Sequence, residues 1–147
     1  MEINFMNILQ ASSKDNHLLQ EAITNYNFQI VPELPRAEIC NIDLVIKNDS
    51  GEPIGGINAE IVNWGILFIS LLFIHEKYRH LGYGSKLLKH VEEKARIKGC
   101  HLSHVDTFDF QGKDFYLDHG YTIFGILDEC PKGHKRYYLK KALTNDK

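Results

Sequence analysis

The sequence predicts a mixed α/β fold, with one β-sheet flanked by helices, in a single domain that spans residues 1–147. Short apolar runs alternate with two segments of helical periodicity, which is the pattern of strand–helix–strand crossovers. The early apolar runs are separated by short polar turns, as in antiparallel hairpins. We therefore expect a mixed sheet of about six to seven strands rather than a purely parallel one.

The N-terminal region is predicted to contain one strand and one helix. A short strand is expected over residues 4–9. Ser12 or Ser13 can cap a helix from about Lys14 to Tyr26, in which apolar residues recur at helical spacing. Prolines downstream mark a loop after this helix, namely Pro32 and Pro35.

The remaining strands follow from their apolar patterns. In residues 54–62, Ile57, Ala59 and Ile61 share one face, whereas residues 66–74 are apolar on both faces, as expected of a covered central strand. Polar turns follow two of the strands, at 48–51 and 63–65. The expected strands are 42–46, 54–62, 66–74, 102–107, 121–127 and 136–139, and the expected helices between them are 85–98 and 112–119.

Composition narrows the class of protein. The formal net charge is −2, and Lys and Arg are spread along the chain rather than gathered in the basic stripe of a nucleic-acid binder. The apolar run 66–74 is too short to cross a bilayer, and residues 1–4 do not resemble the start of a signal peptide. We expect a cytoplasmic protein with neither a nucleic-acid nor a membrane partner.

Neither a disulfide framework nor a metal site is expected. The three cysteines, Cys40, Cys100 and Cys130, are widely spaced and form no CxxC pair. His101 and His104 flank a short stretch of strand, where a spacing of three residues places the two rings on opposite faces.

A polar loop with two glycines, residues 75–84, joins the central apolar strand to the next helix. The first backbone N–H groups of a helix lack intrahelical partners, and the helix dipole adds partial positive charge there. Gly82 and Gly84 allow close approach of a ligand, and Arg79 adds a cation. The loop therefore suits a diphosphate, although its spacing matches neither a Walker loop nor a dinucleotide fingerprint.

Two strings resemble the signatures of the GNAT N-acetyltransferase superfamily, in particular those of its small bacterial stand-alone members. Residues 72–84 are similar to its acetyl-CoA-binding motif, an apolar strand followed by Arg/Gln-x-x-Gly-x-Gly/Ala at the start of a long helix. Arg79, Gly82 and Gly84 occupy the fixed positions of that motif. Residues 115–121 are similar to the second signature, an aromatic-Tyr-x-x-x-Gly-Phe/Tyr run on the short helix before a late strand.

The resemblance covers about residues 42–139 and implies a sheet that is splayed near its middle. Acetyl-CoA, the implied cosubstrate, would lie in the gap beside strand 66–74, with its pantetheine arm paired to the backbone of Phe73 and Ile74 like an added strand. Arg79 and consecutive backbone N–H groups would hold the diphosphate. The N–H groups belong to His80, Leu81, Gly82, Tyr83, Gly84 and Ser85.

The resemblance also implies catalytic roles. Tyr116 occupies the position where many of these enzymes keep a tyrosine near the CoA sulfur, and a phenol with a reference pKa of about 10 can protonate a departing thiolate. The alternative for Tyr116 is a core aromatic residue. The amine must also lose a proton, for which Glu76 is the named candidate base. Glu60, His75, Asp106 and bound water stay open as alternatives.

The implied reaction is transfer of an acetyl group to a primary amine by direct attack on the thioester. A small-molecule amine is favoured as acceptor, whereas a protein N-terminus or a lysine stays open. A non-catalytic CoA-binding sensor or interaction module is the alternative, and Tyr116 favours the enzyme. Proteins of this architecture often pair through their terminal strands, so the resemblance is also compatible with a homodimer.

Overall fold

The structure, a computed structural model, describes residues 7–32 and 39–144. It divides into two compact units, Met1–Glu33 and Leu34–Lys147. The expectation of a single domain over the whole chain stays a prediction. No helix in the described ranges is long and apolar enough to cross a membrane.

The first unit contains the helix α1, Ser13–Ile30. The Ser12 side chain accepts a hydrogen bond from the Asp15 N–H at 3.1 Å, and the Asp15 carboxylate accepts one from the Ser12 N–H at 2.9 Å. This reciprocal capping box fixes the helix start where the sequence predicts it. The helix continues beyond the predicted end at Tyr26. Of the strand expected over 4–9, residues 4–6 lie outside the described residues, and residues 7–9 are not in a strand.

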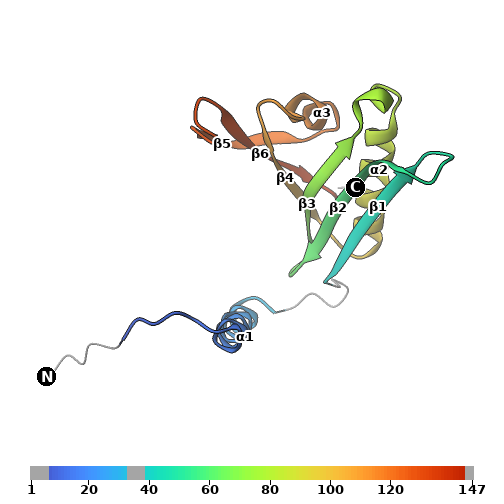
Figure 1. Cartoon of the computed structure of the whole chain (residues 1–147). Coiled ribbons are helices and arrows are strands. Elements are labelled where there is room, and N and C mark those ends of the chain that lie inside the picture. Colours follow the sequence, from blue (N-terminus) through green and yellow to red (C-terminus); the bar gives the residue numbers. More distant parts are fainter. Residues whose placement is uncertain (1–6, 33–38, 145–147) are drawn as a thin grey trace, which may run out of the picture. The chain divides into compact units, whose positions relative to one another are not determined.

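The second unit is built on a mixed sheet of six strands, as far as the structure describes the chain, in the order β1-β2-β3-β4-β6-β5 (Figure 1). Neighbouring strands pair antiparallel except β3 and β4, which run parallel. The chain crosses from β3 to β4 through the helix α2. The predicted mixed sheet is therefore confirmed. The strands are β1 (Cys40–Lys47), β2 (Pro53–Val62), β3 (Ile66–Ile74), β4 (Leu102–Phe108), β5 (Thr122–Asp128) and β6 (Lys135–Ala142).

The sheet splays between β3 and β4. The two strands pair only from Ile66 with Leu102 to Ile69 with Val105. Beyond this point β4 pairs with β6 and β3 with β2, and Figure 1 shows the two strands diverging. The splay that the family resemblance implies is therefore present, near the middle of the sheet.

A β-bulge at Ser70 accompanies the splay. Asn58 of β2 lies opposite Leu71, whereas the next residue of β2 lies opposite Ile69, so that Ser70 is the extra residue. Its hydroxyl donates to the Asn58 carbonyl at 3.1 Å. Bulges bend the strand that carries them, which fits a change of direction here. The expectation that all of β3 is covered on both faces is wrong, because residues 70–74 are exposed or half-buried.

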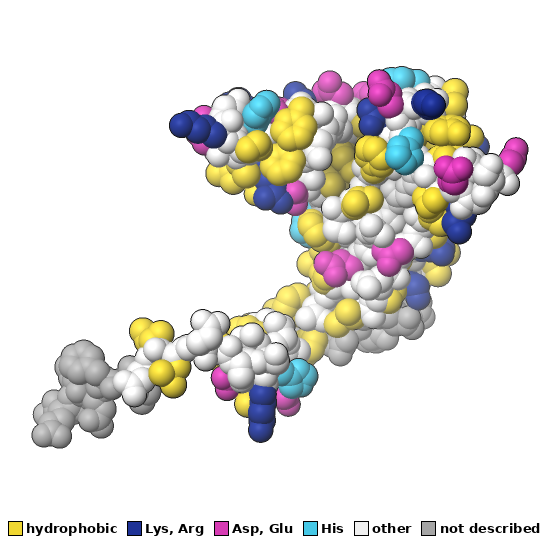
Figure 2. Space-filling model, viewed as in Figure 1, with side chains coloured by type: hydrophobic (Ala, Val, Ile, Leu, Met, Phe, Trp, Pro, Cys, Tyr) yellow, Lys and Arg dark blue, Asp and Glu magenta, His cyan; other side chains and the backbone are white. Residues whose placement is uncertain are grey.

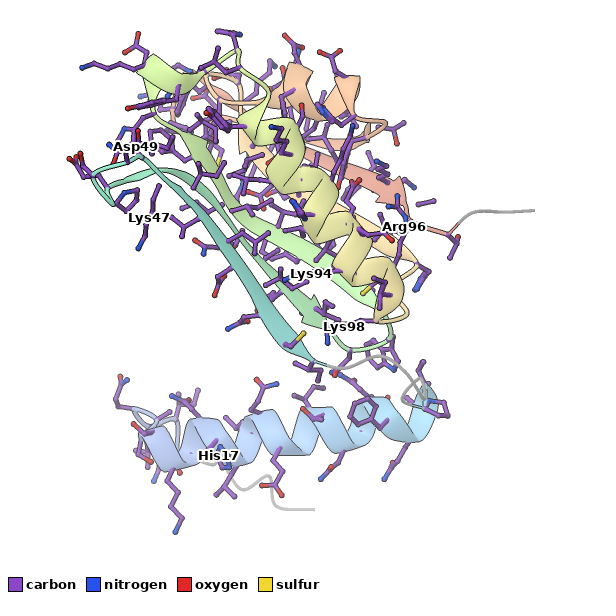
Figure 3. All side chains as sticks on the ribbon, turned by 90° about the vertical axis from the view of Figure 1, so that its right-hand side faces the viewer. His17, Lys47, Asp49, Lys94, Arg96 and Lys98 are labelled. Carbon is purple, nitrogen blue, oxygen red and sulfur yellow. The ribbon has the colours of Figure 1, made fainter. Side chains whose placement is uncertain are left out.

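The helix α2, Tyr83–Ile97, packs against β2 and β3. It begins two residues before the predicted start, and the predicted apolar face is buried. The buried side chains of that face are Leu87, Leu88, Val91 and Ala95. Lys94, Arg96 and Lys98 lie at its C-terminal end, where cations favour the helix dipole (Figure 3). Two short elements complete the unit, the 3-10 helix η1 (Glu76–Tyr78) and the helix α3 (Lys113–Asp118).

A buried polar network, which the sequence analysis missed, joins α2 to the strands behind it. Glu92 is 3% exposed, and Lys141 of β6 donates to its Oε1 at 2.8 Å. The Tyr121 hydroxyl donates to Oε2 at 2.9 Å, and Ser103 lies 2.8 Å from the same hydroxyl. Glu92 follows Leu88 by four residues, so helical spacing alone places it on the inner face.

Removing the cation from this network is expected to destabilise the fold. Lys141→Met leaves Glu92 buried without its charged partner, so we expect the free energy of unfolding to fall by about 2 kcal/mol. The loss is smaller than for a fully buried ion pair because the lysine is partly exposed. Urea unfolding measures the loss, with Lys140→Met as the control on the exposed side of the same strand. Equal unfolding midpoints for the two variants would contradict a stabilising ion pair between Lys141 and the buried Glu92.

Candidate active site

The splay opens a cavity of about 910 Å³ between β3 and β4. Its walls come from the second half of β3, the end of β4, the loop before α2, and α3. A volume of this size suits a cofactor or a drug-sized ligand. Among the predicted site residues, those that line the cavity are Phe73, Ile74, Arg79, His80, Gly82, Tyr83, Gly84, Ser85 and Tyr116.

Glycine suits the two positions 82 and 84 of the loop for different structural reasons. Gly82 is the N-cap of α2 with φ +88°, a left-handed conformation that favours glycine, and no side chain caps this helix end. A Cβ at Gly84 would lie 3.3 Å from the Phe115 ring, so this glycine lets α2 pack closely against α3. Leu81, also predicted for the site, is exposed in the same loop and its side chain is not part of the cavity wall.

Arg79 joins the loop to the end of β3. Its Nε donates to the Ile74 carbonyl at 2.7 Å, and its guanidinium carbon lies 5.5 Å from the centre of the Phe73 ring. The side chain therefore lies along the cavity wall formed by Phe73 and Ile74 and places a positive charge beside the loop that precedes α2. This placement agrees with a role in holding a diphosphate.

Tyr116 lies on α3 and is buried against the cavity, where its ring packs edge-on against Phe115 and Tyr121. Burial, and secondarily the negative charge of Asp106, raise the pKa of the Tyr116 hydroxyl well above its ordinary value. The phenol therefore stays neutral over the physiological pH range and acts as a hydrogen-bond donor. Its position on the wall is compatible with the acid predicted from the sequence.

Of the candidate bases, Asp106 lines the cavity, whereas Glu76, His75 and Glu60 do not. Asp106 accepts two hydrogen bonds on Oδ1 from Arg136, from Nε at 2.9 Å and from Nη2 at 2.6 Å. Glu76 is exposed in η1, His75 precedes it, and Glu60 is exposed on β2. The structure therefore brings Tyr116 together with Asp106 and leaves the named candidate Glu76 outside the cavity wall.

Two polar residues that the sequence analysis did not single out also line the cavity, Thr107 and Gln111. Thr107 Oγ1 accepts from the Gly112 N–H at 3.1 Å, and Gln111 Oε1 accepts from the Phe108 N–H at 2.9 Å. These bonds shape the turn from β4 into α3 and so position Tyr116. Their signal in the sequence is a hydroxyl and an amide just after a strand end, which is too common to identify a site.

Comparison with known proteins identifies the family. A model described as the acetyltransferase (GNAT) family matches residues 10–121. The chain belongs to the GNAT acetyltransferase family. Acetyltransferase Atu2258 of Agrobacterium fabrum is 27% identical over 139 residues, which cover 95% of this chain and 98% of that protein. Blasticidin-S acetyltransferase of Streptomyces morookaense is 35% identical over 96 residues, which cover 65% of this chain and 70% of that protein.

Solved GNAT structures agree with the fold. An acetyltransferase from Bacillus cereus superposes with a TM-score of 0.85 at 32% identity, over 93% of this chain and 97% of that chain. An aminoglycoside 6'-N-acetyltransferase complexed with coenzyme A has the same fold, with a TM-score of 0.65 at 15% identity, over 96% of this chain and 99% of that chain. The predicted family, fold class and acetyltransferase activity are confirmed, and acetyl-CoA as cosubstrate is confirmed at the level of the family.

The residues present in this GNAT chain fit coenzyme A. The cavity runs from the uncapped N-terminus of α2, which suits a diphosphate, along the part of β3 that no longer pairs with β4. Arg79 supplies a cation near the start of α2, and Tyr116 supplies a buried donor on the wall. The face shown in Figure 2 carries side chains of both charges intermixed with hydrophobic ones.

Proposed function

We propose that this GNAT protein transfers the acetyl group of acetyl-CoA to a primary amine of a small molecule. The observation that carries the proposal is the cavity between the splayed strands β3 and β4, with the start of α2 and Tyr116 in its wall. A helix start suited to a diphosphate, a strand edge without a partner among the described residues and a buried tyrosine hydroxyl support the proposal there.

The coenzyme would be bound mainly by backbone groups. After Ile69 the edge of β3 that faces β4 has no strand partner among the described residues, so the amides of a pantetheine arm can pair with Phe73 and Ile74 as an added strand would. The diphosphate would lie against the N–H groups of the loop that contains Gly82, with Arg79 beside it. The loop N–H groups proposed for this role are those of His80, Leu81, Gly82, Tyr83, Gly84 and Ser85.

Tyr116 is proposed as the general acid. Bound acetyl-CoA supplies a thioester whose carbonyl carbon a neutral amine can attack. Tyr116 holds its proton at Oη, since burial and Asp106 oppose its ionisation, and can donate that proton toward the leaving sulfur. Because its pKa is raised, Tyr116 would stay protonated and would stabilise the negative charge that develops on the sulfur chiefly by donating a hydrogen bond.

Asp106 is better placed than Glu76 to receive the amine proton. Asp106 lines the same cavity as Tyr116, and Arg136 orients its carboxylate. We therefore propose Asp106, directly or through a water molecule, as the proton acceptor. Glu76 is exposed in η1, so it would need a chain of water molecules to serve as the base.

The acceptor class is supported by the relative that is named for a small molecule, blasticidin-S acetyltransferase. The experiment follows release of the CoA thiol while the protein is offered blasticidin S, simple primary amines, or peptides with a free N-terminus or lysine. We expect thiol release and an acetylated product with a small-molecule amine. Thiol release with the peptides alone would contradict the small-molecule acceptor. Absence of thiol release with every amine offered would contradict the proposed reaction.

A further inference from the structure

A serine–histidine pair joins the start of α2 to the end of α3. The Ser85 hydroxyl lies 2.8 Å from Nε2 of His119, which is the C-cap residue of α3. Nδ1 of His119 lies 2.7 Å from the Phe115 carbonyl oxygen, and the two rings pack at 4.3 Å. Ser85 lines the coenzyme cavity, whereas His119 lines a separate charged groove of about 900 Å³ beside α2. The pair therefore connects the cavity wall with that groove.

The chemistry of the partners fixes the protons. A carbonyl oxygen can only accept, so Nδ1 of His119 carries a hydrogen and donates it to Phe115. In the neutral ring Nε2 is then an acceptor, and the Ser85 hydroxyl donates to it. In this state the proton of Ser85 points to His119, and only oxygen lone pairs of Ser85 are left for the cavity.

Protonation of the ring reverses this hydrogen bond. Nε2 of a cationic His119 carries a hydrogen and donates to Ser85 Oγ, which frees the Ser85 proton for another acceptor. Ser85 is the third residue of α2, within the loop and helix start proposed to hold the diphosphate. The oxygen atoms of a diphosphate can only accept hydrogen bonds. They can accept one from Ser85 when His119 is protonated, whereas with a neutral His119 they face the lone pairs of Ser85 Oγ.

We propose that His119 is a positioning residue for the coenzyme, whose protonation turns the Ser85 hydroxyl from a donor to His119 into a donor to the diphosphate. This inference rests on the proposed function, because it needs a diphosphate at the start of α2. Coenzyme binding is then coupled to uptake of a proton by His119, and affinity rises as the pH falls.

The charged groups around His119 come from three elements. Cations of α2 and β6 oppose a charge on the ring, whereas carboxylates of α2 and Asp118 of α3 favour it. The groups that share the groove are Lys86, Lys89, His90, Glu92, Glu93, Arg96, Asp118 and Lys141. A second histidine, His80, lines the coenzyme cavity itself, and every variant below retains it.

The experiment measures the Kd of dephospho-coenzyme A by calorimetry between about pH 5.5 and about pH 8. This probe keeps the diphosphate and lacks the phosphate monoester, which titrates in the same range. We expect the wild-type protein to bind about fivefold more tightly at the acidic end. A factor of about five in Kd corresponds to one hydrogen bond, here the bond from Ser85 to neutral His119 that must be broken at the alkaline end before Ser85 can donate to the diphosphate. Titrations in buffers with different ionisation enthalpies should show proton uptake at neutral pH.

Two variants separate this mechanism from a structural role. Ser85→Ala removes the hydroxyl, so affinity should fall at the acidic end and the fivefold dependence should disappear. His119→Gln places an amide N–H where it can donate to Ser85 at every pH, so binding at the alkaline end should approach that of the wild type at the acidic end. A dependence unchanged in both folded variants would overturn the inference alone. No binding by the folded wild type at any pH would overturn the proposed function and the inference with it.

Discussion

Tyr116→Phe is expected to lower kcat by about 100-fold while the Kd for acetyl-CoA changes by less than about threefold. The substitution removes one hydroxyl from a buried ring that packs against Phe115 and Tyr121, and leaves that packing in place. What is lost is the hydrogen bond that Tyr116 is proposed to donate to the developing thiolate. An interaction made chiefly in the transition state affects kcat, whereas ground-state binding stays nearly unchanged.

Tyr121→Phe is the matched control for this prediction. Its hydroxyl belongs to the buried network with Glu92 and Ser103 and is not part of the cavity wall. We expect this variant to unfold at lower urea concentration and to keep kcat within about threefold. If Tyr116→Phe behaves like Tyr121→Phe, with lower stability and unchanged kcat, Tyr116 is a core aromatic residue and not the acid.

Gly82→Asp is expected to weaken acetyl-CoA binding by about 50-fold relative to Gly82→Asn. Both side chains have the same size, and both residue types tolerate the left-handed conformation of Gly82 better than others do. A Cβ at this position meets no atom within 4 Å, so neither side chain clashes, and the two variants share the same backbone strain. The aspartate differs by placing a negative charge where the diphosphate is proposed to bind.

Calorimetric titration of the two Gly82 variants with acetyl-CoA gives the ratio of their Kd values. The two side chains differ in charge and hardly in size, so the unfolding midpoints should be alike, or slightly higher for the aspartate because a negative charge at a helix start favours the helix dipole. Raising the salt concentration should narrow the difference in affinity, because a charge effect is screened. Equal Kd values for the two variants at low salt would show that the diphosphate does not lie at the start of α2.

The sequence predicts most of the elements because their signals are local. The inner face of α2 follows from helical spacing, the cap at Ser12 from its Asp15 partner, and the bounds of β3 from a continuous apolar run. The strand order is non-local and does not follow from these patterns. β6 lies between β4 and β5, which places the last strand next to the centre of the sheet.

The candidate site is predicted in the parts that belong to short motifs, and less well elsewhere. Arg79, Gly82 and Tyr116 stand in strings whose spacing is recognisable. The pairing of Asp106 with Arg136, and of Ser85 with His119, joins residues about 30 or more positions apart, and no local pattern signals either contact. For the same reason the sequence does not show that Gly84 lets α2 pack closely against α3, because the Phe115 ring that it contacts is distant in the sequence.

A crystal structure of the chain with acetyl-CoA tests the central claim most directly. The account predicts that the coenzyme lies between β3 and β4, with its diphosphate at the start of α2 and its sulfur within hydrogen-bond distance of Tyr116 Oη. Coenzyme bound elsewhere on the protein, or in the cavity with its sulfur out of reach of Tyr116, would contradict the proposed site and mechanism.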